Sequence, residues 1–164
     1  MKILNIGSIN KDFFYSVKNI VKPGETISSK NLSVKIGGKG LNQSVAVSKG
    51  GHKIYHAGII NKNDTFILDK LKEWGVDIQN IILSDNPTGH AIIQVEKNGE
   101  NSILINSGAN YDFNLNFISS TVEKINIDIE SFVKLQNVGF NVSSDYLNEY
   151  LGGLLILKIG RAHV

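Results

Sequence analysis

Short apolar runs with no helical period recur along the chain, and glycine, proline or asparagine stands near the end of most of them. Such runs predict buried strands of an α/β sheet, whose two faces are both covered. Lys97–Glu100 predicts a hairpin-type turn between the last two of these strands. The predicted strands are Lys2–Ile9, the extended segment Glu25–Ile36, Lys53–Ile60, Asn80–Leu83, Gly89–Val95 and Asn101–Asn106.

Between these runs lie stretches that predict helices. The first opens at the loop Gly37–Gly40 and stops at Gly50, the second runs from an N-cap at Asp64 to Trp74, and the third covers Asn114–Lys124. Their inward faces are predicted to carry Leu41, Ser44, Val45 and Ser48 in the first helix, and Ile67, Leu71 and Trp74 in the second. A further strand at Ser131–Leu135 and a helix at Ser143–Tyr150 are weaker candidates. This alternation predicts an α/β fold that binds its ligand at the carboxyl ends of parallel strands.

Size and charge narrow the possible functions. A chain of 164 residues with 41% hydrophobic and 20% charged residues is expected to bury the core of one domain. The formal net charge is +2 and no block of like charge occurs, so neither nucleic acid nor a membrane is an expected partner. The longest apolar run, Leu154–Leu157, is too short to cross a bilayer, and no cysteine is present. We therefore expect a cytoplasmic protein.

The last six residues differ in composition from the rest of the chain. Ile159–Val164 contains the only arginine, Arg161, in a sequence otherwise rich in lysine, isoleucine and asparagine. We interpret residues 159–164 as a non-native tail and residues 1–158 as the N-terminal part of one domain.

The loop Gly37–Gly40 is the sharpest chemical feature of the sequence. Its three glycines let backbone N–H groups approach a ligand closely at the start of a helix. A nucleotide-binding P-loop requires Lys followed by Ser or Thr, whereas Lys39 is followed by Gly40, so that motif is absent. The alternative interpretation is a tight strand-to-helix turn with a solvated lysine.

Asn10 and Asp12 form the second candidate site. Residues two apart on an extended chain point the same way, so one amide and one carboxylate face a common ligand. A carboxylate accepts hydrogen bonds from two hydroxyls and an amide both donates and accepts, which suits a vicinal diol. The alternative is an Asx-turn after the first strand.

The histidines give weaker signals. His52 and His56 would share a face of a strand, but no third ligand follows at a zinc-binding spacing, and His90 has no Ser or Asp arrangement typical of a triad. We therefore predict no metal site and assign no catalytic residue.

Five motifs occur together in one order: GSINKD from Gly7, PGET from Pro23, GGKGLNQSVA from Gly37, PTGHAIIQV from Pro87, and the stretch from Asn98 to Asn110. In this order and spacing they resemble the N-terminal half of the ribokinase-like, phosphofructokinase-B type carbohydrate kinases. The likeness covers about residues 2–136.

The resemblance implies an incomplete Rossmann-like ribokinase fold with a small β-sheet lid over a sugar. It implies transfer of phosphate from Mg²⁺-ATP to the 5-hydroxyl of ribose, with a possible monovalent cation and a homodimer formed through the lids. The sugar-binding residues carried over by motif are Asn10, Asp12, Gly38, Lys39 and Asn42.

The sequence also departs from the family. Val138 follows Gln136 and Asn137 where the family has a glutamate that reaches the sugar, and Asn61 stands where the family usually has glycine. No counterpart of the DTxGAGD-like motif, which supplies the catalytic base, occurs, so we expect this chain to be inactive by itself. The alternatives are a fructokinase-like or nucleoside kinase, a sugar-binding module without catalysis, and a nonfunctional translation product.

Overall fold

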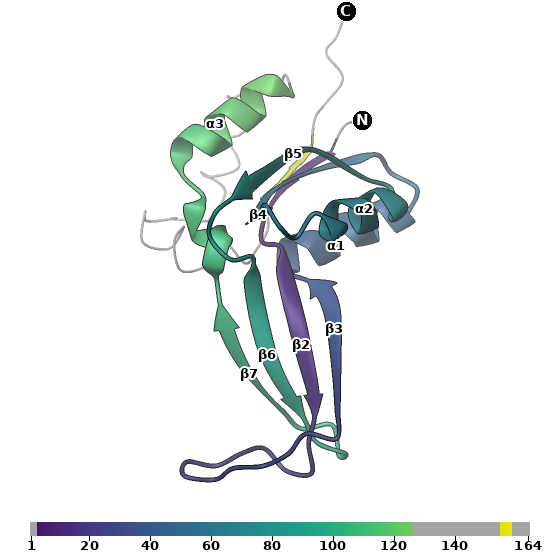
Figure 1. The fold of residues 1–164 in the computed structure, drawn as a ribbon. Helices are drawn as coiled ribbons and strands as arrows, with labels where there is room; N and C mark the ends of the chain where they lie inside the picture. Colours follow the sequence, from purple (N-terminus) through teal and green to yellow (C-terminus); the bar gives the residue numbers. More distant parts are fainter. Residues whose placement is uncertain (1–2, 126–154, 159–164) are drawn as a thin grey trace, which may run out of the picture.

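The computed structural model describes residues 3–125 and 155–158, which form two four-stranded sheets (Figure 1). We call the sheet with the order β5-β4-β1-β8 the base sheet, and the sheet with the order β3-β2-β6-β7 the lid. Figure 1 shows the lid extending away from the base as a long, narrow blade. The mixed α/β architecture expected from the sequence is confirmed.

The base sheet is built around β1 (Ile3–Ile6), all four residues of which are buried. β1 pairs in parallel with β4 (Ile54–Asn61), which pairs in parallel with β5 (Val76–Ser84). On the other side of β1, β8 (Leu155–Lys158) runs antiparallel to it. These strands form the platform on which the helices pack.

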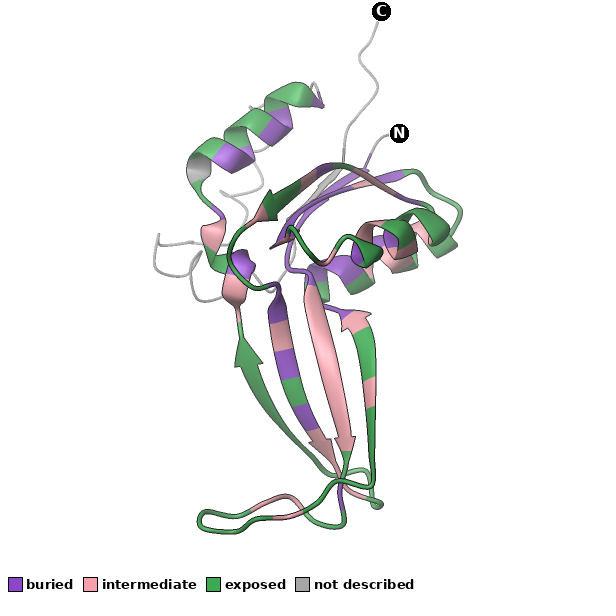
Figure 2. Ribbon diagram, in the orientation of Figure 1, coloured by how far each residue is buried: buried purple, intermediate pink, exposed green. Residues whose placement is uncertain are grey.

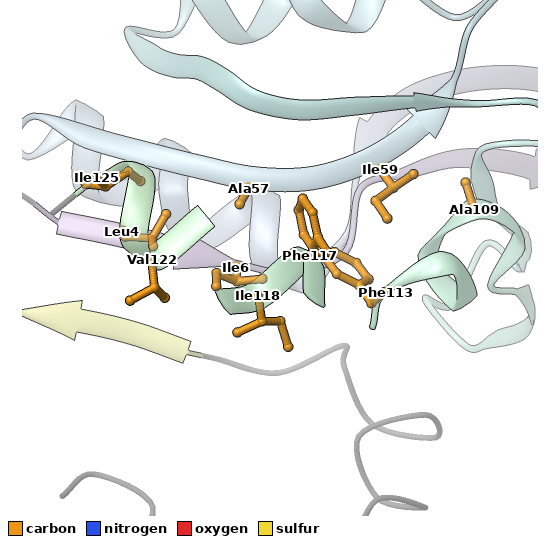
Figure 3. Packing of buried hydrophobic residues seen from close by; sticks show 10 residues of the cluster. All are labelled: Leu4, Ile6, Ala57, Ile59, Ala109, Phe113, Phe117, Ile118, Val122 and Ile125. Carbon is orange, nitrogen blue, oxygen red and sulfur yellow. The ribbon is translucent and has the colours of Figure 1, made fainter. Parts of the chain in front are cut away.

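Two apolar clusters cover the two faces of the base sheet, because alternate residues of a strand point to opposite faces. On one face, α1 (Lys39–Lys49) and α2 (Phe66–Glu73) contribute Leu41, Ile67 and Leu71 to a cluster with Ile3, Ile9, Ile54, Ile60 and Val76. On the other face lie the short 3₁₀ helix η1 (Gly108–Asp112) and α3 (Leu115–Lys124). Their cluster, shown in Figure 3, consists of Leu4, Ile6, Ala57, Ile59, Ala109, Phe113, Phe117, Ile118, Val122 and Ile125.

The lid consists of β2 (Asn10–Ser16), β3 (Asn31–Gly37), β6 (Gly89–Val95) and β7 (Asn101–Asn106). β2 runs antiparallel to β3 and parallel to β6, and β6 and β7 form a hairpin. Every residue of β7 is exposed, in contrast to β1, all of whose residues are buried (Figure 2). The lid is therefore a single layer with little apolar packing of its own.

Several sequence predictions are confirmed. β6 and β7 have the predicted limits, and the turn between them is closed by a hydrogen bond from the Gly99 N–H to the Glu96 carbonyl (3.1 Å). The helix predicted over Asn114–Lys124 is α3, which begins one residue later; the structure adds that Asn114 is its N-cap, with a side chain that accepts a hydrogen bond from the Phe117 N–H (2.9 Å).

Other predictions are wrong in detail. The first predicted strand ends at Ile6 instead of Ile9. Asn10 and Asp12 lie on extended chain, as the first interpretation required, and the alternative of an Asx-turn is wrong; that extended chain is a separate strand, β2, which was not predicted. The extended segment predicted from Glu25 is a strand only from Asn31. Asp64 is not an N-cap: the cap position of α2 is Thr65, and the Asp64 carboxylate binds side chains of other segments instead.

Three further predictions lie outside the described residues. They concern the strand at Ser131–Leu135, the helix at Ser143–Tyr150 and the tail at residues 159–164.

Candidate functional site

The candidate site lies where the lid joins the base sheet, at the start of β2. In the lid, Asn10 pairs with Gly37 of β3 on one side and with Gly89 of β6 on the other. Both neighbours lack a side chain, and a Cβ atom added to Gly89 would lie 2.5 Å from the Asn10 Oδ1 atom. The two glycines therefore leave room for polar side chains at this end of the sheet.

Asn110 of η1 holds this corner in place. Its Nδ2 atom donates to the Asn10 Oδ1 atom (2.9 Å) and to the Ile9 carbonyl (3.2 Å), while its Oδ1 atom accepts from the Ile9 N–H (3.1 Å). Asn110 is buried, so these bonds satisfy an amide that would otherwise be costly to bury. They leave the Nδ2 group of Asn10 available as a donor.

Asp12 follows on the same face of the lid, two residues after Asn10. Its carboxylate lies over Gly37, where a Cβ atom would collide with it. Burial raises the pKa of the Asp12 carboxyl above its ordinary value. Within the described part of the chain this carboxylate accepts no hydrogen bond from a side chain, so it offers acceptor oxygens to a ligand with hydroxyl groups.

The glycine loop brings the start of α1 to the same corner. Gly38, the N-cap of α1, has φ of 101°, and a Cβ atom there would lie 2.5 Å from the Ser8 carbonyl oxygen. The Leu41 N–H donates to that carbonyl (3.1 Å) and the Asn42 N–H donates to the Gly38 carbonyl (2.9 Å). Lys39 and Asn42 are exposed in the first turn of α1. The structure thus brings the loop together with Asn10 and Asp12.

A second polar cluster ties the lid to the base on the opposite face of β2. The Lys11 Nζ atom lies 2.8 Å from an Asp64 carboxylate oxygen, and the Thr88 hydroxyl donates to the same carboxylate (2.6 Å). Burial alone would raise the pKa of Asp64, but the hydrogen bonds from Lys11 and Thr88, with the Lys11 charge, outweigh it and hold the pKa below its ordinary value. Asp64 is therefore a charged link between the two sheets.

Asn61, the departure from the expected glycine, is accommodated beside this cluster. Its backbone N–H donates to the Thr88 hydroxyl oxygen (2.8 Å), and its Nδ2 atom donates to the carbonyls of Asp85 and Asn86 (3.1 and 2.9 Å). Asn61 thus fastens the loop between β5 and β6.

The three histidines of the described residues have different surroundings. His56 is fully buried beneath α1, His52 is exposed, and His90 lies in β6 with its ring against Phe13, at a centroid distance of 6.1 Å. Among residues 3–125 and 155–158, no three His, Asp or Glu side chains gather to hold a metal ion. In the same part of the chain no helix has the length and apolar character needed to span a membrane.

Sequence reasoning missed Asn110 and the true partners of Asp64. Asn110 lies within one of the motifs singled out from the sequence, so its place there was the available signal. No comparable signal marked Asp64, because its partners Lys11 and Thr88 are distant in the chain.

Comparison with known proteins agrees with this geometry. Residues 1–136 match the pfkB family of carbohydrate kinases. The chain belongs to this family. It is 40% identical over 108 residues to the ribokinase of Haemophilus influenzae, an overlap of 64% of this chain and 35% of the relative. It is 35% identical over 135 residues to the ribokinase of Schizosaccharomyces pombe, covering 76% of this chain and 42% of the relative.

Solved structures show the same relationship. The crystal structure of ribokinase from Cryptococcus neoformans var. grubii serotype A in complex with ADP is 42% identical with a TM-score of 0.63, over 66% of this chain and 34% of that one. Ribokinase of Arabidopsis thaliana complexed with ribose and ATP is 33% identical with a TM-score of 0.58, over 65% of this chain and 36% of that one. The chain thus spans about a third of the length of these relatives.

Proposed function

We propose that this chain forms the sugar-binding part of a kinase that phosphorylates the 5-hydroxyl of ribose with ATP. The observation that carries the proposal is the corner formed by Asn10, Asp12 and the loop at Gly38, in which an unpaired carboxylate faces a helix start. The names of the similar proteins support ribose as the sugar.

The donor and acceptor set suits a sugar. Asn110 fixes the carbonyl side of the Asn10 amide, which leaves its NH₂ group to donate to a hydroxyl oxygen. The Asp12 carboxylate accepts from hydroxyl groups, and Lys39 and Asn42 add donors from the first turn of α1. A polyol with adjacent hydroxyls satisfies these groups together, whereas an apolar ligand would leave them unpaired.

Ribose titration of the Asp12→Ala variant tests this assignment. Loss of a charge-assisted hydrogen bond is expected to weaken binding by about 1.5 to 3 kcal/mol, roughly 10- to 150-fold. The matched control is Asp69→Ala, which removes an exposed carboxylate of α2 and is expected to leave ribose affinity unchanged. Unchanged ribose affinity in Asp12→Ala, measured by isothermal titration calorimetry, would remove Asp12 from the site.

The proposal places ATP and Mg²⁺ with residues that this chain does not supply. Phosphoryl transfer needs a base for the attacking hydroxyl and groups that stabilise charge on the γ-phosphate, and Mg²⁺ supplies part of that charge stabilisation. The described residues contain no cluster of carboxylates or histidines that fits a metal ion, so these residues do not form a magnesium site. We expect this chain alone to release no ADP above background with ribose and Mg²⁺-ATP. Turnover that disappears in Lys39→Ala would overturn this expectation.

The same titration tests two alternatives. A related kinase acting on fructose or a nucleoside would bind that ligand more tightly than ribose. Nucleoside kinases such as that of Methanocaldococcus jannaschii, 20% identical with a TM-score of 0.62, share the fold alone. Ribose binding in the complete kinase without ADP release would instead favour a sugar-binding module.

We further propose a cytoplasmic protein, in keeping with the absence of cysteine, that forms a homodimer through its lids. β7 carries three consecutive exposed apolar residues, Ile103, Leu104 and Ile105, on an edge strand that presents unpaired backbone groups. Light scattering on Ile103→Glu and Leu104→Glu, one for each face of the lid, tests the dimer. A monomeric wild-type chain, or dimers in both variants, would contradict it.

A further inference from the structure

A buried polar network lies beneath the start of α1, outside the candidate sugar site. Asn5 and His56 are paired residues of the neighbouring strands β1 and β4, and both are fully buried on the face that α1 covers. Ser44, also fully buried, extends from α1 between them. Three polar side chains inside an apolar layer are costly unless they bind one another, so their arrangement requires a physical account.

The network forms a chain of hydrogen bonds that ends on the glycine loop. The Asn5 Nδ2 atom donates to the Gly40 carbonyl (2.7 Å) and to the Ser44 hydroxyl oxygen (3.0 Å). The Ser44 oxygen lies 2.8 Å from the His56 Nδ1 atom. The Asn5 amide donates to the serine oxygen, which still has one hydrogen and one acceptor site for His56 Nδ1, so the tautomer of the ring decides the direction of that bond.

The surroundings of the ring agree with a neutral histidine. Burial lowers the pKa of His56 to about 4, although the Gly7 backbone partly opposes this effect. The ring is accommodated because Gly58 lacks a side chain: a Cβ atom there would lie 3.1 Å from His56 Nε2. A neutral ring has one N–H donor and one acceptor nitrogen, so Nδ1 bonds the Ser44 hydroxyl in either tautomer.

Gly40 connects this network of hydrogen bonds to the candidate sugar site. Its Cα atom packs against Gly7, where an added Cβ on Gly40 would lie 2.6 Å from the Gly7 Cα atom. The next residue, Leu41, donates its N–H to the Ser8 carbonyl, and the Asn42 N–H closes the first turn on Gly38. The side chains of Asn5 and Ser44 thus hold the first turn of α1 against the base sheet. Gly7 and Ser8, in the segment that follows β1, contact the same turn.

We propose that Asn5, Ser44 and His56 are positioning residues that fix the first turn of α1 through the Gly40 carbonyl. This placement aligns Gly38, Lys39 and Asn42 with Asp12, so its importance for ribose rests on the proposed function. The three side chains bind one another and the Gly40 carbonyl, so they act on the sugar site through the first turn of α1.

Hydrogen exchange of the 164-residue chain tests the positioning role without any ligand. In Ser44→Ala, the Leu41 and Asn42 amides are expected to exchange about tenfold faster than in the wild type, because both hydrogen bonds of the Ser44 hydroxyl, to Asn5 and to His56, are lost. The matched control is Ser48→Ala, one turn further along α1, which removes a hydrogen bond from the Ser48 hydroxyl to the Trp74 carbonyl (2.8 Å). It is expected to leave both amides unchanged.

A pair of substitutions at His56 separates positioning from simple packing. His56→Asn retains an acceptor close to the position of Nδ1 and is expected to keep the Leu41 and Asn42 amides protected. His56→Phe fills the same space without an acceptor and is expected to release them about tenfold. Equal exchange in Ser44→Ala and Ser48→Ala, or fast exchange of these amides in the wild type, overturns the proposal.

Ribose titration of the same variants then separates this proposal from the proposed function. Ser44→Ala is expected to bind ribose about tenfold more weakly than Ser48→Ala. If the wild type binds no ribose while Ser44→Ala still releases the two amides, the proposed function of this chain fails and the positioning role stands. Unaltered ribose affinity together with released amides would show that the first turn does not determine sugar binding, and would overturn the link to the site.

Discussion

The base sheet and the lid each have four strands, but the two sheets differ in how far their residues are exposed to solvent. In β1 every residue is buried, whereas in β7 every residue is exposed. Yet the two strands have similar apolar segments: Ile3 and Leu4 in one, Ile103 and Leu104 in the other. The difference lies in what covers them, because α1, α2 and α3 lie over the base sheet and no helix of the described chain lies over the lid (Figure 2).

This contrast separates the source of stability from the source of function. Burial of apolar area stabilises the base sheet by about 25 cal/mol for each Å² removed from water. The lid gains little from this term and is held mainly by strand pairing and by the cluster of Lys11, Asp64 and Thr88. The candidate sugar site lies at the junction, where a rigid platform meets a sheet with little core of its own.

The largest expected effect is a difference in the free energy of unfolding between one substitution in the base sheet and one in the lid. Ile60→Ala in β4 empties a fully buried position and is expected to lower the free energy of unfolding by about 2 to 5 kcal/mol. Leu104→Ala in β7 shortens a side chain that is 67% exposed in the single chain, and in the monomer it is expected to change this free energy by less than about 0.5 kcal/mol. Urea unfolding of both variants, at a protein concentration too low for the proposed lid dimer to form, measures the difference. Equal losses under that condition would show that the lid is covered within the single chain.

Stability at low pH provides the second test, because His56 of the base sheet is fully buried and its protonation favours the unfolded chain. The pKa of His56 is lowered from 6.5 to about 4, so between these values the unfolded chain binds a proton that the folded chain does not. Stability is therefore unaffected by this group above pH 6.5 and falls as the pH drops toward 4, by about 3 kcal/mol in total.

The variant His56→Asn removes this dependence while keeping an acceptor for Ser44. Subtracting its stability profile from that of the wild type cancels the carboxylates, which also titrate in acid. A difference profile that is flat between pH 6.5 and 4 would show that the ring is protonated, or exposed, in the folded protein.

The link between the sheets gives a smaller effect. Asp64→Ala removes the partner of Lys11 and the acceptor of the Thr88 hydroxyl, and is expected to cost about 1 to 2 kcal/mol. This loss of stability should appear as faster amide hydrogen exchange in β2 and β6, while the exchange rates in β4 stay unchanged. The exposed pair formed by Lys62 and Asp85 is the control, since Asp85→Ala is expected to have almost no effect. Uniform loss of protection across both sheets would contradict a local link.

The sequence predicted those features whose cause is local. β6 and β7 flank the turn predicted at Lys97–Glu100 and have the predicted limits, and α3 ends at the predicted Lys124 and begins one residue after the predicted Asn114. The spacing of Asn10 and Asp12 correctly implied a shared face, although the strand that carries them was not predicted.

Features that depend on distant residues could not be predicted. Asp64 resembles an N-cap by its local context, but its partner Lys11 lies 53 residues away in the sequence, on a strand of the other sheet. Asn110 lies 100 positions from Asn10, and the Asn5 network joins three elements. Buried polar residues in apolar strands were the available signal, because they indicate a partner without identifying it.

The smallest expected effect concerns the end of the chain. We propose that residues 159–164 do not belong to the kinase domain, since they contain the only arginine and differ in composition from the rest. Removing them is expected to leave the thermal midpoint unchanged, because a non-native tail has not been selected to pack against the core. The contrast is deletion of residues 155–164, which also removes β8 and exposes the edge of β1 that pairs with it. That longer deletion is expected to lower the midpoint, because it unpairs the most buried strand of the base sheet. A clear drop after the shorter deletion would make the tail part of the fold, and equal midpoints in all three chains would show that β8 does not stabilise the base sheet.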